Sequence, residues 1–266
     1  MGGPLFPRAA RGLIGGAGPW VRRRAVIGGA LASMAPSSIR AQTPEPVYEG
    51  LTFDSHGKAI RAIHYRPAER GRGAAIVMMH GSSGRIMNRG PWHHLAMRFA
   101  RDGYEVLTPL FTDAWPDDGI RPPRMMEAWR DVGQHAINWF IDRGIDRRRT
   151  AMFGYSLGSY VAVDGALGNS RAAAAIALAG GVDVYPPRVP RRRIPVLMIR
   201  ADGDTHVLPR HTATWISFLR NYDINVRVEV LRDSNHLFTA AKWLEIFQLS
   251  AAFYGGNIGR PSQDNA

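Results

Sequence analysis

The residues best suited to covalent chemistry lie at Gly154-Tyr155-Ser156-Leu157-Gly158, a G-x-S-x-G motif. Apolar residues with β-branched or ring side chains precede the motif, and a run of small residues with helical character follows it. A serine between such a strand and helix sits in a tight, strained turn, and small neighbours avoid clashes with both elements. We therefore predict that Ser156 is a nucleophile; the alternative is a turn serine that caps the helix.

A serine hydroxyl becomes nucleophilic only when a base within hydrogen-bonding reach removes its proton. Three histidines follow Ser156 in the sequence: His206, His211 and His236. His236 directly follows the last expected strand, whereas His206 lies inside an aspartate-rich loop and His211 at a helix start. The order along the chain therefore predicts His236 as the base.

The base in turn needs a carboxylate that fixes its tautomer and stabilises its charged form. The apolar segment 195–200 leads into Ala201-Asp202-Gly203-Asp204, which offers two carboxylates. We predict Asp204 as the acid and a turn role for Asp202. Asp183, after the preceding strand, is a third candidate.

Two N–H groups are expected to stabilise the negative oxygen that forms when a carbonyl is attacked. One is the backbone N–H of Leu157, next to the nucleophile. The second is expected from His80-Gly81-Ser82-Ser83-Gly84, most plainly the N–H of Ser82. We interpret His80 as a residue that braces this loop.

Nothing in the sequence indicates a metal or an organic cofactor. His93 and His94 are adjacent on an expected helix, so they point in different directions, and no third ligand accompanies them. The chain has no cysteine, which excludes thiolate ligands, a thiol nucleophile and disulfides. It also has no phosphate-binding loop or dinucleotide fingerprint.

The elements that must position these residues follow an α/β order. Residues 47–55 and 59–67 are expected to form a β-hairpin around His56-Gly57-Lys58. Strands and helices then alternate, which predicts right-handed βαβ units and one mainly parallel sheet flanked by helices. Strands are expected within 74–80, 104–110, 150–156, 172–181, 194–204 and 226–236, and helices within 92–103, 125–144 and 240–256. The loops with the candidate residues all follow strands, where ligands of such sheets bind.

Two further features remain open at this stage. The segment 111–126 contains Trp115 and several prolines; it follows a strand and could overhang the site or be a plain surface excursion. Tyr155 could line a pocket or pack beneath the sheet.

The first 41 residues differ from the rest of the chain. They hold six arginines and no acidic residue, so the formal charge of +12 falls to +6 on the remainder. Arg22-Arg23-Arg24 precede a short apolar run, which resembles a twin-arginine export signal, with cleavage expected after Ala41. The alternative is an uncleaved basic arm or membrane anchor. We predict a signal at 1–41, a linker at 42–46, a catalytic domain at 47–255 and a tail at 256–266.

With these motifs in place, residues 47–255 resemble the dienelactone hydrolase family of α/β-hydrolases. The resemblance implies hydrolysis of esters or lactones by Ser156, Asp204 and His236, without a metal. The namesake enzymes use cysteine at the elbow where this chain has Ser156. The context Ser-Asn-His-Leu-Phe also differs from the more usual Gly-x-x-His-Gly-Phe.

The sequence thus predicts an exported bacterial serine hydrolase, periplasmic or extracellular, that acts on a small ester or lactone. It predicts no nucleic-acid partner, because no dense basic stripe with interleaved aromatic residues occurs, and no stable membrane insertion after cleavage. A peptidase or acyltransferase with the same triad, or a non-catalytic binding protein on this scaffold, are the alternatives.

Overall fold

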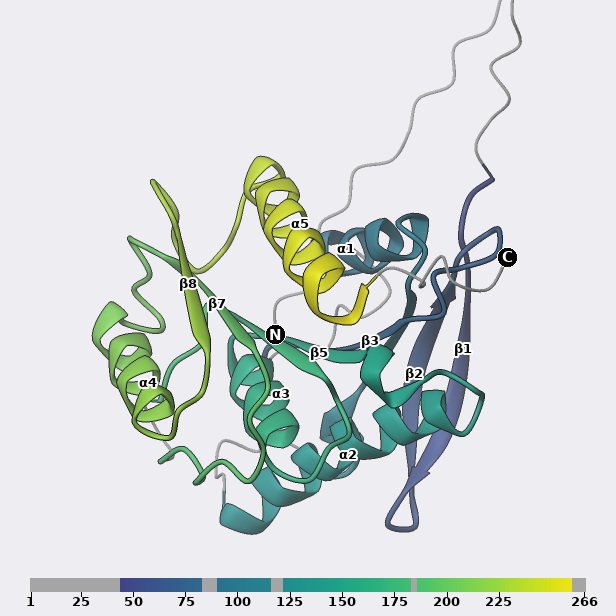
Figure 1. The fold of residues 1–266 in the computed structure, drawn as a ribbon, viewed down its shortest axis with the longest axis horizontal. Helices are drawn as coiled ribbons and strands as arrows, with labels where there is room; N and C mark the ends of the chain where they lie inside the picture. Colours follow the sequence, from purple (N-terminus) through teal and green to yellow (C-terminus); the bar gives the residue numbers. More distant parts are fainter. Residues whose placement is uncertain (1–43, 83–89, 116–121, 183–185, 260–266) are drawn as a thin grey trace, which may run out of the picture. The chain divides into compact units, whose positions relative to one another are not determined.

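A single eight-stranded sheet forms the centre of the protein in the computed structural model, which describes residues 44–82, 90–115, 122–182 and 186–259. Its strand order is β1-β2-β4-β3-β5-β6-β7-β8. The strands β3 to β8 run parallel to one another (Figure 1). Strand β2 runs antiparallel to both of its neighbours, β1 and β4. This is the α/β-hydrolase fold, as predicted.

The bounds of the elements follow the expected alternation. The strands are β1 (Val47–Ser55), β2 (Lys58–Arg66), β3 (Ala75–Met79), β4 (Glu105–Pro109), β5 (Thr150–Tyr155), β6 (Ala174–Leu178), β7 (Val196–Ala201) and β8 (Val226–Leu231). The α-helices are α1 (Gly90–Arg101), α2 (Pro123–Ile141), α3 (Leu157–Leu167), α4 (Pro209–Asn221) and α5 (Ala240–Tyr254). Short helical turns are η1 (Phe111–Asp113), η2 (Arg147–Arg149) and η3 (Gly255–Gly259).

The hairpin at the start of the sheet confirms the predicted turn. Ser55 pairs with Lys58, and the intervening His56 and Gly57 both have positive φ, at 52° and 76°. Two residues with positive φ match the right-handed twist of the flanking strands. The hairpin then joins the parallel strands through β2, which pairs with β4.

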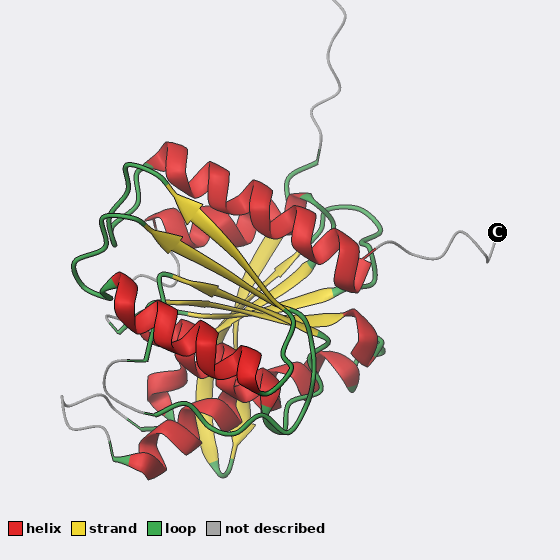
Figure 2. Ribbon diagram, turned by 60° about the vertical axis from the view of Figure 1, so that its left-hand side comes forward, coloured by secondary structure: helices red, strands yellow, loops and turns green. Residues whose placement is uncertain are grey.

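Helices cover both faces of the sheet. Buried residues of α2, α3 and α4 pack in one apolar cluster, and those of α1 and α5 pack in another. Figure 2 shows the helices as two layers with the strands between them. The strands β3 and β6 are buried along their whole length, which explains their uninterrupted apolar sequences. None of the helices in the described part of the chain is long and apolar enough to cross a membrane.

Some segments differ from the expectation. The end of segment 111–126 is the first turn of α2, where Met125 and Met126 are buried, while residues 116–121 lie outside the described residues. At the other end of the domain, Ile258 is buried and the carbonyl of Gly259 accepts a hydrogen bond from Arg149, so ordered packing continues past residue 255. The proposed signal at 1–41 lies outside the described residues.

Candidate active site

Ser156 occupies a strained turn between β5 and α3. Its backbone has φ 54° and ψ −123°, a conformation that a residue with a side chain rarely adopts. Its N–H donates to the carbonyl of Leu178 at 2.9 Å, which ties the turn to the neighbouring strand β6. The strain is thus maintained by the surrounding sheet.

The two glycines of the motif are required by close backbone contacts. A Cβ atom on Gly154 would lie 2.1 Å from the carbonyl oxygen of Gly158. A Cβ atom on Gly158 would lie 2.2 Å from the carbonyl oxygens of Met79 and His80. Both distances are far below van der Waals contact, so helix α3 can approach β5 and β3 only because these positions lack side chains.

The structure brings together the three side chains that the sequence singled out for a triad. Nε2 of His236 lies 2.9 Å from Oγ of Ser156, and Nδ1 of His236 lies 2.8 Å from Oδ2 of Asp204. Asp204 and His236 are buried, 4% and 7% exposed. The three residues follow β5, β7 and β8, so the carboxyl edge of the sheet assembles the row. Such a row can move a proton from a hydroxyl to an imidazole held by a carboxylate.

Backbone N–H groups orient the carboxylate of Asp204. Its second oxygen, Oδ1, accepts from the N–H of His206 at 2.9 Å and from that of Val207 at 2.8 Å. The two oxygens therefore have separate tasks, one toward the loop and one toward the imidazole. This loop leads into α4, which begins at Pro209.

Asp202 contacts the histidine loop but not the histidine side chain. Its exposed carboxylate accepts the backbone N–H groups of Asp233 and Ser234, each at 3.1 Å. The N–H donors, Ser234 first, lower the pKa of Asp202. Asp202 therefore fastens the β8 loop to the β7 loop, and it is not a partner of His236. Asp183 lies outside the described residues.

Two aromatic rings pack on the imidazole of His236. The ring of His206 stacks 4.8 Å away at an interplanar angle of 20°, and that of Tyr155 lies 5.4 Å away at 30°. The hydroxyl of Tyr155 donates to the carbonyl of His236 at 2.8 Å, and burial raises the pKa of this tyrosine to about 12. Tyr155 thus holds both the ring and the backbone of His236. His211 lies in the first turn of α4.

Sequence reasoning missed these two neighbours of the base. It left Tyr155 undecided between pocket and sheet, and it considered His206 only as a base. The signal that could have identified Tyr155 is its position between the strand and the nucleophile. This position places Tyr155 at the carboxyl end of β5, the same edge of the sheet as the loop after β8.

Asp204, His206 and His236 also form a cluster in which one potential metal-ligating atom of each side chain lies within 4.8 Å of those of the other two. The donor geometry does not suit a metal ion. The two imidazole planes are nearly parallel, so their lone pairs do not converge, and both nitrogens of His236 already face Ser156 and Asp204. His93 and His94 lie in α1, where Nδ1 of His93 is within 3.0 Å of the Tyr65 hydroxyl.

The residues proposed for the oxyanion site flank the serine. Leu157 is the first residue of α3, and its N–H has no hydrogen-bond acceptor among the described residues, as is usual for the first turn of a helix. The β3 loop lies beside it: a Cβ atom on Gly81 would be 3.5 Å from Cβ of Ser156 and 3.2 Å from the Tyr155 ring. Ser82 follows in this loop and is exposed.

His80 packs beneath this loop. Its ring stacks on Phe111 at 4.2 Å, and Nδ1 lies 2.5 Å from the carbonyl oxygen of Gly81. Burial lowers the pKa of His80 to about 4, so the imidazole is neutral at pH 7, and its Nε2 has no partner among the described residues. A neutral ring that donates through Nδ1 fits the predicted bracing role.

Comparison with protein families identifies the chain's relatives. Residues 60–252 match the model of the dienelactone hydrolase family. The chain belongs to the dienelactone hydrolase family. Membership supports a hydrolase of ester-type bonds that acts on a small molecule. No curated protein matches this chain.

Solved structures share its fold. A dienelactone hydrolase-like promiscuous phosphotriesterase, P91, from metagenomic libraries is 14% identical, with TM-score 0.69, and the match covers 81% of this chain and 100% of P91. Dienelactone hydrolase from Anabaena variabilis is 16% identical, with TM-score 0.67 and coverage of 80% and 99%. An esterase from Pyrobaculum calidifontis is 18% identical, with TM-score 0.66 and coverage of 81% and 86%.

Proposed function

We propose that this protein is a serine hydrolase that cleaves small carboxylic esters or lactones through an acyl-enzyme on Ser156. The observation that carries the proposal is the continuous row from Ser156 Oγ to His236 to Asp204, with distances of 2.9 and 2.8 Å. Family membership supports the ester-type bond as the target.

The first half of the proposed reaction forms the acyl-enzyme. Nε2 of His236 takes the proton of the Ser156 hydroxyl as Oγ attacks the substrate carbonyl carbon. The carbonyl oxygen becomes negatively charged and accepts hydrogen bonds from the N–H groups of Leu157 and Ser82. His236 then gives its proton to the leaving alkoxide oxygen, and the carbon–oxygen bond of the ester breaks.

The second half releases the acid. A water molecule gives a proton to His236 as its oxygen attacks the acyl carbon, and the same N–H groups again stabilise the oxyanion. His236 returns the proton to Oγ, which restores Ser156. Asp204 stays ionised and stabilises the imidazolium in both halves.

The proposal is tested by reaction with a fluorophosphonate probe, which modifies activated serines. The native protein should be labelled, and Ser156→Ala and His236→Ala should lose labelling, by about 10,000-fold or more in rate. Ser217→Ala, which removes an exposed serine of α4, is the matched control and should be labelled as the native protein is. An unlabelled native protein with an intact fold, or a Ser156→Ala variant labelled at the native rate, would contradict the proposal.

We also propose that residues 1–41 direct export. The arginines ahead of a short apolar run support this proposal. N-terminal sequencing of the protein from the periplasm and the medium tests it: a mature start near Gln42 is expected, and an intact start in the cytoplasm alone would exclude export.

A further inference from the structure

A cavity of about 430 Å³ opens at the amino-terminal edge of the sheet, the edge opposite the triad. Its lining comes from three segments that lead into β5, β6 and β7. Four of the lining residues are arginines, and none is acidic or aromatic: Arg147, Arg148, Asn169, Ser170, Arg171, Ala173 and Arg192. The volume is within the range of small-molecule sites, so this cavity is large enough for a ligand and strongly positive.

Three of these arginines have no acidic partner among the described residues. The guanidinium groups of Arg147, Arg148 and Arg171 are exposed and form no ion pair or hydrogen bond with any described residue. Elsewhere on the surface, arginines are often paired, as Arg61 is with Asp113 and Arg188 with Glu127. The unpaired donors of the cavity are therefore available to an anion from outside.

The acidic residue nearest to Arg147 in the sequence is Asp146, and its carboxylate already accepts a backbone N–H. Asp146 caps η2, where its carboxylate accepts the N–H of Arg148 at 2.9 Å. This bond fixes the turn that presents Arg147 and Arg148. Asp146 thus orders one wall of the cavity without lining it.

Arg192, the fourth arginine of the lining, is held in place by the backbone. Its Nη1 donates to the carbonyl oxygens of Ala166, Ser170 and Ala172, at the end of α3 and the start of β6. Its other N–H groups form no bond to the described chain. A guanidinium held in this way is preorganised, because a ligand need not immobilise it.

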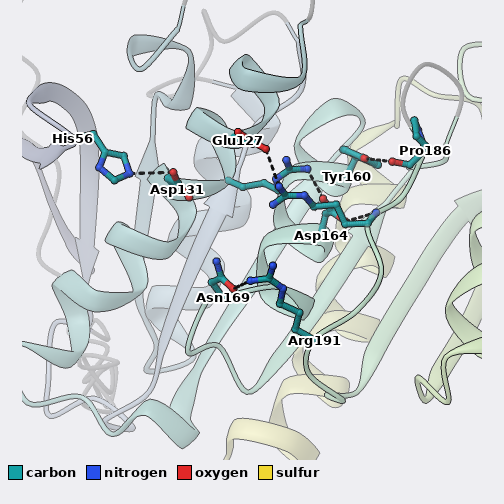
Figure 3. Close-up of polar contacts among 10 residues, drawn as sticks. His56, Glu127, Asp131, Tyr160, Asp164, Asn169, Pro186 and Arg191 are labelled. Carbon is teal, nitrogen blue, oxygen red and sulfur yellow. Dashed lines mark hydrogen bonds and ion pairs between the residues drawn. The ribbon is translucent and has the colours of Figure 1, made fainter.

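The segment that carries Arg192 is fastened along α3. The hydroxyl of Tyr160 donates to the carbonyl of Pro186 at 2.8 Å (Figure 3), and the carboxylate of Asp164 accepts the backbone N–H of Arg188 at 3.1 Å. In the same view, Arg191 donates to the Asn169 side chain at 3.0 Å. Tyr160 and Asp164, one turn apart on α3, thus hold the chain that precedes Arg192.

The positive charges also oppose one another. Burial, and next the charge of Arg147, lower the pKa of Arg192. An anion between these groups would relieve the repulsion. Arginine matches phosphate oxygens with paired N–H donors, and a cluster of four exceeds what a single negative charge can balance.

We propose that this cavity is a binding site for a ligand with two or more clustered phosphate groups, held by Arg147, Arg148, Arg171 and Arg192. The lining has no aromatic side chain, so recognition rests on charge and N–H donors and not on stacking with a ring. The phosphates could belong to a soluble oligophosphate or to a lipid headgroup. This site goes beyond the proposed hydrolase function and does not require it.

The test measures binding of tripolyphosphate to the full-length protein by isothermal titration calorimetry in about 0.15 M salt, where non-specific attraction is screened. The double variant Arg148→Gln/Arg171→Gln should bind about tenfold more weakly or worse. Arg70→Gln/Arg124→Gln removes the same charge from exposed arginines outside the cavity and should bind as the native protein does. Ser156→Ala should also bind normally, which separates this test from the catalytic proposal.

A second arm identifies the source of the phosphates. Sedimentation with phosphatidylcholine vesicles, with and without phosphatidylinositol bisphosphate, whose headgroup carries clustered phosphates, is measured for the same variants. Cavity-dependent binding of tripolyphosphate supports a soluble ligand, and cavity-dependent binding of the phosphatidylinositol bisphosphate vesicles alone supports a headgroup. Binding in neither arm, or equal weakening in both double variants, would overturn the proposal.

Discussion

The carboxyl and amino ends of the parallel strands, which form two opposite edges of the central sheet, differ in whether their charged groups have partners within the chain. At the carboxyl edge, Asp204 accepts two backbone N–H groups and faces His236, so each polar group of the row has a partner within the chain. At the amino edge, Arg147, Arg148 and Arg171 have no counter-charge in the described part of the protein.

The difference separates two kinds of site. A row that is satisfied internally is preorganised for proton transfer, and its substrate need not carry charge. A cluster that is not satisfied internally gains most from an ion that it does not contain. The same sheet thus has an internally paired polar row at one end of its parallel strands and unpaired positive charge at the other.

The largest expected effect concerns two aspartates of the carboxyl edge. Asp204→Asn should slow fluorophosphonate labelling by about 10,000-fold, because the amide no longer holds the tautomer and charge of His236. Asp202→Asn should slow it by less than about tenfold, since the amide oxygen keeps one of the two N–H bonds from Asp233 and Ser234 and this side chain does not contact the imidazole of His236. Labelling rates measure both, and equal effects of the two substitutions would contradict the acid role of Asp204.

The next effect concerns the strained turn. Gly154→Ala should lower the free energy of unfolding by about 4 kcal/mol or more, because its Cβ would meet the Gly158 carbonyl at 2.1 Å. Gly50→Ala is the control: a Cβ there has no atom within 4 Å, so stability should be retained. Urea unfolding measures both. A Gly154→Ala variant as stable as the native protein would show that the turn tolerates displacement.

His80 predicts a dependence of stability on pH. Burial lowers its pKa to about 4, so below its ordinary value of about 6.5 the unfolded chain binds a proton that the folded chain does not. Above about pH 6.5 this difference in proton binding has no effect on the free energy of unfolding. As the pH falls to about 4, it lowers the free energy of unfolding by about 3 kcal/mol. His80→Asn keeps a donor for the Gly81 carbonyl and should reduce this slope.

Urea unfolding between pH 7 and pH 4 measures the slope. The exposed His94→Asn variant is the matched control and should behave as the native protein does. A native slope in the His80→Asn variant would mean that another group titrates.

The smallest effect belongs to the amino edge. Arg147→Gln should leave stability unchanged or raise it by about 0.5 kcal/mol at low salt, since it removes repulsion with Arg192. The gain should vanish in high salt. Arg70→Gln is the control and should show no gain. A clear loss of stability in the Arg147→Gln variant would mean that Arg147 has a stabilising partner within this chain, and would contradict the difference between the two edges.

The sequence predicted the fold and the members of the triad row because both depend on order along the chain. Apolar runs define the strands, and parallel strands deliver Ser156, Asp204 and His236 to one edge whatever the loops do. Whether these residues have the roles proposed for them is a matter for the labelling experiment.

Contacts between segments that are distant in the sequence could not be predicted from it. The bond from Tyr155, at the end of β5, to the carbonyl of His236, in the loop after β8, joins segments far apart in the sequence. The place of Tyr155 in the sequence indicates its end of the sheet but not this partner. Likewise, Arg147–Arg149 and Arg191–Arg193 look like two short basic runs, and no dense stripe was evident. Only the adjacent starts of β5, β6 and β7 bring Arg147, Arg148 and Arg192 of these runs to one cavity.

The elbow also bears on how this lineage can diversify. Its backbone path is dictated by the missing side chains of Gly154 and Gly158 and by the bond from the Ser156 N–H to β6, not by the atom at the tip of residue 156. Exchange between oxygen and sulfur at that tip therefore leaves the scaffold intact. The turn thus depends on the absence of side chains at Gly154 and Gly158 and not on which atom ends the side chain of residue 156.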